Sequence, residues 1–419
     1  MKRVLDVWWD GRIVGQLIQN QHGALGFGYA PAWLKDDRTP PLSASLPKRE
    51  KPFTKRACQP FFAGLLPEED QREAVAQALG VSEGNDFSLL DSLGGEVAGA
   101  IEILPAGAQP PPPPPNQSPK RLDDTELLTL LDVLPRRPFL VGEKGLRLSL
   151  AGAQSKVPVV LVDDAIALPA PGQPTTHILK PPIERYKGTT ENEAFVMRLA
   201  KAIGLQVAPV EPRVVGGRTF LLIERYDRIR DPQGRVRRIH QEDFCQALGI
   251  LPKDKYAKEG GPTFADSFKL VREQSSVPAL DVLALLDAAL FNTFVGNADA
   301  HGKNFSILYQ IRGPRLAPLY DLLCTAFYPE LSPAFAMKIG KRATLGELDA
   351  KGWERFAHDA GMSLPFIRQR ACKIADDIRG KIASVADEIV SHGMDRRTVN
   401  DLMYFIGERI EPCVVRLTK

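Results

Sequence analysis

The sequence predicts an α+β protein with two lobes, a β-rich first lobe and a mostly helical second lobe. Short apolar, β-prone runs separated by turn signals fill much of the chain up to about residue 240. Helical patterns dominate beyond Gln241, and from Leu345 onward nearly every segment reads as helix, with stops at Gly361 and Gly393. Six consecutive prolines, Pro110–Pro115, predict a stiff polyproline II spacer, with an SH3-type ligand as the alternative interpretation.

Composition limits the class of protein. The 419 residues are 44% hydrophobic and 25% charged, which excludes an extended disordered chain, and the net charge of +3 argues neither for nor against a nucleic-acid partner. The five scattered cysteines form no CxxC pair, which excludes a zinc finger or disulfide scaffold and suits a reducing cytosol. The first residues do not resemble a signal peptide, and the most apolar window, Pro278–Gly296, contains Asp281 and Asp287. We therefore expect a cytoplasmic protein without a membrane segment.

The first hundred residues predict a small β-rich region. Val4–Val7 and Ile13–Leu17 are strand-like, and Asp10-Gly11 between them is a strong hairpin signal. A helix is expected over Gln71–Leu79 and a further strand over Val97–Leu104. The predicted domains are an N-terminal β-rich subdomain (1–108), a proline-rich linker (109–120), the remainder of the first lobe (121–240) and a helical lobe (241–419).

Beyond the linker the pattern predicts a second sheet flanked by helices. Asp124–Leu134 is an amphipathic helix, and Thr190–Ile203 is a helix that begins with a capping box formed by Thr190 and Glu193. That structural role leaves Glu191 and Glu193 outside the candidate site. The strands are expected over Leu146–Leu150, Val157–Val162, Ile166–Leu168, His177–Lys180 and Thr219–Ile223.

A polar stretch directly after an apolar helix is the most informative feature of the sequence. Leu280–Val295 carries a wide apolar stripe at the helical period and ends at Gly296, so the helix should be buried. The next residues, Asn297–Asn304, are polar. Polar side chains in this position must reach water in a cleft or find hydrogen-bond partners.

A hairpin after this stretch would bring an amide and a carboxylate together. Phe305–Tyr309 and Leu316–Leu319 are strand-like, and a turn at Arg312-Gly313 pairs positions whose numbers sum to 625. The same sum places Asn304 opposite Asp321.

Asp299 lies one loop before this pair, five residues ahead of Asn304. Oxygen ligands of this kind bind Mg²⁺ together with a phosphate chain. Phosphoryl transfer uses one Asp as the proton acceptor, with an Asn and a second Asp on the metal ions. The alternative is that these are ordinary turn residues.

Three weaker signals lie in the first lobe. Lys180 ends an apolar strand, where it could pair with phosphates or merely protect a strand end. Ser149–Lys156 joins two predicted strands with small residues, although it matches no standard phosphate-binding motif. Glu224–Asp227 follows an apolar strand, where backbone groups could face an adenine ring; Arg225 and Asp227 could equally be surface charge.

Taken together, these segments resemble the HipA-type serine/threonine kinase toxins. The motifs that carry the resemblance in the second part of the chain are Ser149–Lys156, Lys180-Pro-Pro, Glu191-Asn-Glu193, Glu224-Arg-Tyr-Asp-Arg228, His240-Gln-Glu-Asp-Phe244, Asn297–Phe305 and Leu319-Tyr-Asp321. The N-terminal region is similar to that family over Gly26–Trp33, Pro41–Pro47, Phe61–Pro67, Asn85–Phe87 and Gly94–Gly99. The resemblance implies the long form of the family, with a bilobal kinase-like fold and an additional N-terminal β subdomain.

The resemblance also implies roles for individual residues. Asp299 would be the catalytic base, Asn304 and Asp321 the magnesium ligands, and Ser149 the site of autophosphorylation. The implied ATP contacts are Lys180 with the α/β-phosphates, Ala151, Gly152, Ala153, Gln154, Ser155 and Lys156 in a covering loop, Glu224, Arg225 and Tyr226 at the adenine, and His301, Gly302, Lys303 and Asn304 in the catalytic loop. A phosphate on Ser149 carries about −1.5 to −2 charge and would drive the loop out of an apolar interior, which would switch the kinase off.

Cofactors and partners follow only from the resemblance. They are ATP and Mg²⁺, a HipB-like helix-turn-helix antitoxin, operator DNA reached mainly through that antitoxin, and an aminoacyl-tRNA synthetase as substrate, with glutamyl-tRNA synthetase the leading candidate. Two other functions stay open: a phosphotransferase acting on a small molecule, and a catalytically idle corepressor that only binds a HipB-like protein. An intact Asp299, Asn304 and Asp321 set argues against the idle corepressor.

Overall fold

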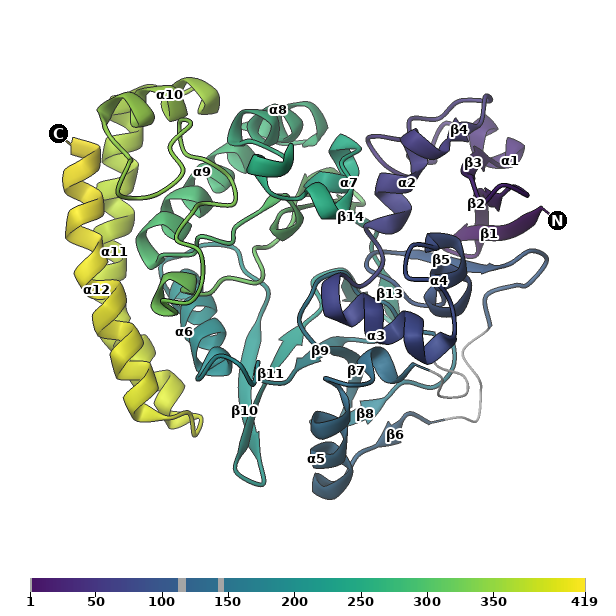
Figure 1. Cartoon of the computed structure of the whole chain (residues 1–419), viewed down its shortest axis with the longest axis horizontal. Coiled ribbons are helices and arrows are strands. Elements are labelled where there is room, and N and C mark those ends of the chain that lie inside the picture. Colours follow the sequence, from purple (N-terminus) through teal and green to yellow (C-terminus); the bar gives the residue numbers. More distant parts are fainter. Residues whose placement is uncertain (1, 112–117, 142–146, 419) are drawn as a thin grey trace. The chain divides into compact units, whose positions relative to one another are not determined.

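A computed structural model describes residues 2–111, 118–141 and 147–418 (Figure 1). Helices and sheets are mixed along the chain, so the predicted α+β class is confirmed. Most of the proline run lies outside the described residues, and the predicted domain boundaries stay predictions. Two compact units interleave along the chain: the first comprises Met1–Pro181, Glu224–Lys253 and Leu308–Gln310, and the second Pro182–Ile223, Asp254–Ile307 and Ile311–Lys419.

The first unit opens with the predicted hairpin. Asp10 and Gly11 connect its strands with φ angles of +49° and +71°, the left-handed conformation that tight hairpin turns require. The hairpin belongs to a five-stranded sheet in the order β4-β3-β2-β1-β5. Its strands are β1 (Arg3–Trp9), β2 (Arg12–Gln19), β3 (Leu25–Tyr29), β4 (Phe53–Thr54) and β5 (Ile101–Pro105).

Local capping explains where the helices of the first unit begin and end. The side chain of Asn85 accepts a hydrogen bond from the Ser88 amide, and Asp123 and Glu126 form a capping box. Gly80, in the left-handed region, ends the predicted helix after Leu79. The helices are α1 (Pro31–Lys35), α2 (Lys55–Ala63), α3 (Glu69–Leu79), α4 (Asp86–Leu93), α5 (Asp124–Val133) and α7 (Phe244–Leu248).

A second sheet of this unit places β9, β7, β8 and β6 side by side in that order. These strands are β6 (Lys120–Arg121), β7 (Val157–Val162), β8 (Ala165–Leu168) and β9 (His177–Lys180), and the short strands β12 (Arg228–Arg230), β13 (Val236–Arg238) and β14 (Gln241–Asp243) follow later. The strand predicted over 146–150 is absent from residues 147–150, and Leu146 is not described. Leu148 makes one isolated parallel bridge to Glu96. Glu96 itself belongs to no strand, so the bridge does not extend into a ladder.

The second unit is mainly helical, and one helix start differs from the prediction. Its elements are α6 (Thr189–Ala202), β10 (Val210–Val215), β11 (Arg218–Glu224), α8 (Phe264–Gln274), α9 (Pro278–Val295), β16 (Gly313–Leu316), α10 (Ala350–Ala360), α11 (Leu364–Ser391) and α12 (Arg396–Thr418). Strand β15 (Ser306–Gln310) begins in this unit, and its residues Leu308–Gln310 belong to the first unit. The capping box of Thr190 and Glu193 is wrong. Gly188, with φ +73°, turns the chain directly into α6, so Thr190 lies inside the first turn and both side chains are buried.

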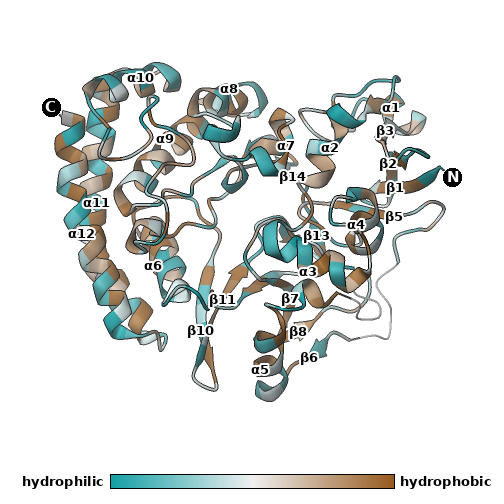
Figure 2. Ribbon diagram, in the orientation of Figure 1, coloured by the Kyte–Doolittle hydropathy of each residue, from teal (hydrophilic) through white to brown (hydrophobic). Residues whose placement is uncertain are grey.

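The C-terminal helices follow the prediction. α11 and α12 pack against each other, and both carry hydrophobic and hydrophilic segments in Figure 2, as amphipathic helices do. Gly361 ends α10 in the left-handed conformation. Among the described residues, α9 is the one helix long and apolar enough to cross a membrane, and 72% of that window is buried, as in the core helix of a globular domain.

A buried carboxyl group in the first unit predicts a pH-dependent stability. Glu242 is 1% exposed, accepts hydrogen bonds from the Ala44 amide (2.9 Å), the Tyr309 hydroxyl (2.5 Å) and Ser43, and burial raises its pKa to about 7. The folded state therefore keeps a proton that the unfolded chain releases above about pH 4.5, and this stabilisation disappears as the pH rises through 7.

Glu242→Gln keeps the shape of the side chain and cannot ionise. Between pH 5 and pH 8 we expect the wild type to lose roughly 3 kcal/mol of unfolding free energy relative to this variant. Urea denaturation at both pH values measures the difference. Parallel pH profiles of the two proteins would contradict the assignment.

Candidate active site

The candidate site of the second unit starts where α9 ends. Gly296 ends the helix with φ +79°, and a Cβ atom there would lie 2.7 Å from Arg409 Nε and 3.0 Å from Ala326 Cβ. Both the backbone conformation and the crowding favour glycine at this position. The chain therefore leaves a buried helix through a fixed turn and enters the polar loop 297–304.

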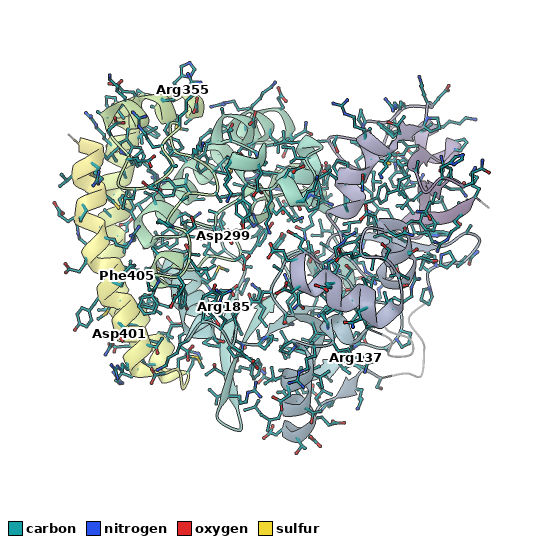
Figure 3. All side chains as sticks on the ribbon, in the orientation of Figure 1. Arg137, Arg185, Asp299, Arg355, Asp401 and Phe405 are labelled. Atoms are coloured by element: carbon teal, nitrogen blue, oxygen red, sulfur yellow. The ribbon has the colours of Figure 1, made fainter. Side chains whose placement is uncertain are left out.

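Hydrogen bonds on both sides hold the backbone of Asp299. Its amide donates to Asn297 Oδ1 (3.2 Å), and its carbonyl accepts from the His301 amide (2.8 Å). One residue earlier, the Ala298 amide donates to Thr325 Oγ1 (2.8 Å). The Asp299 side chain, labelled in Figure 3, is exposed. Its Oδ1 accepts a hydrogen bond from the Tyr256 hydroxyl at 3.0 Å.

Asn304 and Asp321 are in direct contact. Asn304 Nδ2 donates to Asp321 Oδ2 at 3.0 Å, and Asn304 Oδ1 accepts from the His301 amide at 3.0 Å. The predicted contact is therefore confirmed. Gly302–Asn304 form a short 3-10 turn. His301, Gly302 and Lys303 therefore lie in the same loop as Asn304.

The hairpin that produces the contact has a different turn from the predicted one. β15 ends at Gln310 and β16 begins at Gly313, so the turn is Ile311-Arg312 and not Arg312-Gly313. The Ala317 amide donates to the Ser306 carbonyl (2.8 Å), which makes the paired numbers sum to 623. A shift of two residues keeps every side chain on its predicted face, because side chains alternate with a period of two. Asn304, in a 3-10 turn, and Asp321, with its left-handed backbone, both lie outside the two strands, and their contact is present despite the shifted register.

Asp321 is held in an unusual backbone conformation. Its φ is +59°, in the left-handed region that favours glycine, and such residues cluster at functional sites. Neighbouring backbone is fixed on both sides: Leu319 exchanges hydrogen bonds with Gln206 and Ala208, and Cys324 exchanges two with the side chain of Asn192 on α6. This scaffold keeps the carboxylate beside Asn304.

The donor set of this pair fits magnesium. One carboxylate and one amide supply hard oxygen atoms, and Mg²⁺ is usually bound by one or two carboxylates, with waters and substrate phosphates completing its shell. The described residues contain no group of three or more His, Cys, Asp or Glu side chains that could hold a metal. The pair alone therefore offers two protein ligands for such an ion.

In the first unit, residues 151–156 form a compact, half-buried loop. Gly152 has φ +111°, and Lys156 Nζ donates to the Ala151 carbonyl at 2.6 Å, closing the loop on itself. The Glu68 amide donates to the Gly152 carbonyl (3.2 Å), and Gln154 Nε2 donates to the Pro181 carbonyl (3.2 Å), directly after β9. The predicted loop residues, including Ala153 and Ser155, thus lie beside the strand end that carries the buried Lys180.

Ser149 is fully buried immediately before this loop. Its Oγ donates to the Leu65 carbonyl at 2.8 Å, and its amide donates to the Glu96 carbonyl at 2.8 Å. Both partners lie in the N-terminal hundred residues. The N-terminal subdomain therefore holds the candidate loop and Ser149 in place.

The predicted adenine segment is anchored differently from the expectation. Glu224 is exposed and Tyr226 is half-buried, with its hydroxyl donating to Gln241. The alternative that Arg225 and Asp227 are surface charge is wrong, since they are 3% and 2% exposed and form a bidentate ion pair with N–O distances of 3.0 and 2.8 Å. The backbone of the segment is thus fixed by a buried pair.

Glu96 lies in the segment Gly94–Gly99 that carries part of the resemblance, but its side-chain role was not predicted. Its side chain, 4% exposed, accepts hydrogen bonds from Arg225, Arg228, Arg238 and from both the amide and hydroxyl of Thr175. Burial alone would raise the pKa of this carboxyl, but the arginines outweigh burial and lower it to about 2. Glu96 is separated in the sequence from Arg225, Arg228 and Arg238 by more than a hundred residues. No local pattern in the sequence therefore indicates that these four side chains meet.

Comparison with known proteins identifies the family of the chain. The family model of the HipA-like C-terminal domain matches residues 148–386, and that of the HipA N-terminal domain matches residues 5–104. The chain is 32% identical to the serine/threonine-protein kinase toxin HipA of Shewanella oneidensis over 358 residues, which cover 82% of this chain and 81% of the relative. The chain belongs to the HipA family of serine/threonine kinase toxins.

Two further matches cover nearly the whole chain. A Sinorhizobium fredii protein named "Putative kinase Y4mE" is 60% identical over 418 residues, 99% of both chains. The solved structure of the Shewanella oneidensis HipA, HipB and operator DNA complex contains a chain that matches with a TM-score of 0.84 at 27% identity, covering 99% of this chain and 97% of that one. The HipA fold thus extends over both units.

Proposed function

We propose that this protein is a Mg-ATP-dependent protein serine/threonine kinase and the toxin of a type II toxin–antitoxin pair. The observation that carries the proposal is the contact between Asn304 and Asp321 at the base of a hairpin, in the same fixed loop as the exposed Asp299. Membership of a family of kinase toxins adds independent support.

Each group has a defined task in phosphoryl transfer. Asp299 accepts the proton of the attacking hydroxyl. The oxygen of that hydroxyl forms a bond to the γ-phosphorus, while the bond between the γ-phosphorus and the β-phosphate oxygen breaks. Asn304 and Asp321 would hold a magnesium ion, which would supply positive charge against the phosphates. The resemblance to the family assigns Lys180 and residues 151–156 to the phosphates and residues 224–226 to the adenine.

The partners and the target are proposed from the relatives. The Shewanella oneidensis HipA is found in a complex with HipB and operator DNA. We expect this protein to bind a HipB-like helix-turn-helix antitoxin and to reach DNA mainly through it. Its proposed substrate is an aminoacyl-tRNA synthetase in the cytoplasm, glutamyl-tRNA synthetase first among them, whose phosphorylation halts translation and causes growth arrest and persistence.

The direct test uses purified wild-type protein, Mg-ATP and a panel of aminoacyl-tRNA synthetases from the same cell. We expect one synthetase to gain phosphate on a serine or threonine and to lose its charging activity. Phosphate transfer to small hydroxyl compounds, with none to any protein, would contradict the proposal and identify a small-molecule phosphotransferase.

Autophosphorylation of Ser149 should switch the kinase off. The fully buried Ser149 hydroxyl donates to the Leu65 carbonyl, so a charged group there meets a carbonyl oxygen in the interior of the protein. We expect Ser149→Asp to displace the loop and weaken ATP binding roughly tenfold or more, because burying an unpaired charge costs several kcal/mol. Titration of the variant with a fluorescent ATP analogue measures this.

Asparagine provides the matched control, since it has the size of aspartate without its charge. Ser149→Asn should bind ATP much more tightly than Ser149→Asp, and Ser149→Ala should stay active longer than the wild type during incubation with Mg-ATP. Equal ATP affinity of the aspartate and asparagine variants would refute the electrostatic switch.

A further inference from the structure

A tyrosine outside the assigned site contacts the side chain of Asp299. The Tyr256 hydroxyl donates a hydrogen bond to Asp299 Oδ1 at 3.0 Å. We propose that Tyr256 is a positioning residue for phosphoryl transfer, whose hydroxyl orients the Asp299 carboxylate toward the acceptor hydroxyl. This inference rests on the proposed function, because it assigns Tyr256 a task only if Asp299 is the base.

The turn that carries Tyr256 is built around this residue. The Tyr256 carbonyl accepts hydrogen bonds from the Glu259 amide (2.8 Å) and the Gly261 amide (3.0 Å). Gly260 lies in the left-handed region with φ +94°, and a Cβ atom on Gly261 would lie 2.4 Å from the Asp254 carbonyl oxygen. Two glycines therefore allow a turn too tight for other residues, and the turn fixes the tyrosine backbone.

This turn is joined to the catalytic loop by backbone hydrogen bonds. The Ala257 amide donates to the Ala336 carbonyl (2.9 Å), and the Ala336 amide donates to the Ala298 carbonyl (2.7 Å). The Tyr256 ring also packs edge-on against the His301 ring, with centroids 5.4 Å apart. The tyrosine is thus connected to the residues on both sides of Asp299. These contacts fix its position relative to Asp299.

The chemistry of a phenol suits this task. An exposed aspartate side chain samples several rotamers, whereas a productive reaction needs the reacting atoms aligned. A tyrosine hydroxyl stays protonated at neutral pH, so it donates to one carboxylate oxygen without removing the negative charge that the base needs. In this proposal the other oxygen of the carboxylate takes the acceptor proton.

Tyr256→Phe removes the hydroxyl and keeps the ring. We expect kcat for phosphorylation of Ser149 or of a protein acceptor to fall roughly tenfold or more, because hydrogen bonds to charged groups are among the stronger ones. KM for ATP and the melting temperature should stay the same. The matched control is Tyr404→Phe, the same chemical change at a tyrosine that is 67% exposed on α12, and it should leave kcat unchanged.

A double variant separates positioning from a merely structural effect. In the Asp299→Asn background, Tyr256→Phe should lower the residual rate no further, because no base remains to be oriented. An unchanged or raised kcat in Tyr256→Phe, a parallel rise of KM for ATP, or an additive loss in the double variant would each overturn the inference. A wild type without any phosphotransfer would instead defeat the proposed function itself.

Discussion

Asp299→Asn is expected to lower the rate of phosphotransfer by roughly 100- to 10,000-fold, the range contributed by a general base. The substitution keeps the size and the hydrogen-bonding shape of the side chain, and the backbone hydrogen bonds to Asn297 and His301 do not involve it. ATP affinity and melting temperature should therefore stay near the wild-type values. The rate of phosphate incorporation at saturating Mg-ATP measures the effect.

The matched control for this substitution is Asp401→Asn. Asp401 is exposed on α12 and is labelled with Asp299 in Figure 3. The control should phosphorylate at the wild-type rate and still arrest growth, whereas Asp299→Asn should do neither. An Asp299→Asn protein that remains toxic would show that the base lies elsewhere.

Glu96→Ala should cause the largest loss of stability, about 3–5 kcal/mol of unfolding free energy. The side chains of Arg225 and Arg228 are only 1% and 3% exposed. Removal of the Glu96 carboxylate leaves each guanidinium group without one of its two buried carboxylate partners. Urea denaturation measures the loss. The matched control is Glu73→Ala, because Glu73 is an exposed glutamate on α3, and its removal should change stability by less than about 0.5 kcal/mol.

The pH dependence of stability gives Glu96 a second signature. The pKa of this carboxyl is lowered to about 2 in the folded protein, against an ordinary value of 4.5. Its contribution is therefore complete above pH 4.5 and is lost as the pH falls toward 2. The difference in stability between wild type and Glu96→Ala should shrink across that window, and a constant difference would contradict the assignment.

Loss of Glu96 should also weaken nucleotide binding. Its backbone exchanges hydrogen bonds with Arg147 and Ser149, just before the candidate phosphate loop, and its side chain binds Arg225 in the candidate adenine segment. One residue of the N-terminal subdomain thus supports two segments proposed to contact ATP. The segments proposed to contact ATP therefore depend on the N-terminal subdomain for their position.

Local patterns were enough to predict the elements that frame the site. The Asp10-Gly11 turn, the apolar stripe of α9 and its stop at Gly296 depend on neighbouring residues, and the structure has all three. The contact of Asn304 with Asp321 was predicted from a hairpin after the polar loop, and the structure has both the hairpin and the contact, although the turn lies one residue earlier than predicted.

The features that were missed depend on distant parts of the chain. The buried cluster around Glu96 joins residues more than a hundred positions apart, and no local signal marks it. The capping box at Thr190 failed because the preceding Gly188 adopts a left-handed conformation, which moves the helix start by one residue. Tyr256 was missed because a single tyrosine in a loop gains meaning only from its contact with Asp299.

The most direct measurement is intact-mass spectrometry of dephosphorylated wild-type protein incubated with Mg-ATP, beside Asp299→Asn and a wild-type sample containing EDTA. We predict that the wild type gains one phosphate, that peptide mapping places it on Ser149, and that neither control gains any. A wild type without added phosphate, or an Asp299→Asn protein modified as fast as the wild type, would contradict a protein kinase built on Asp299, Asn304 and Asp321.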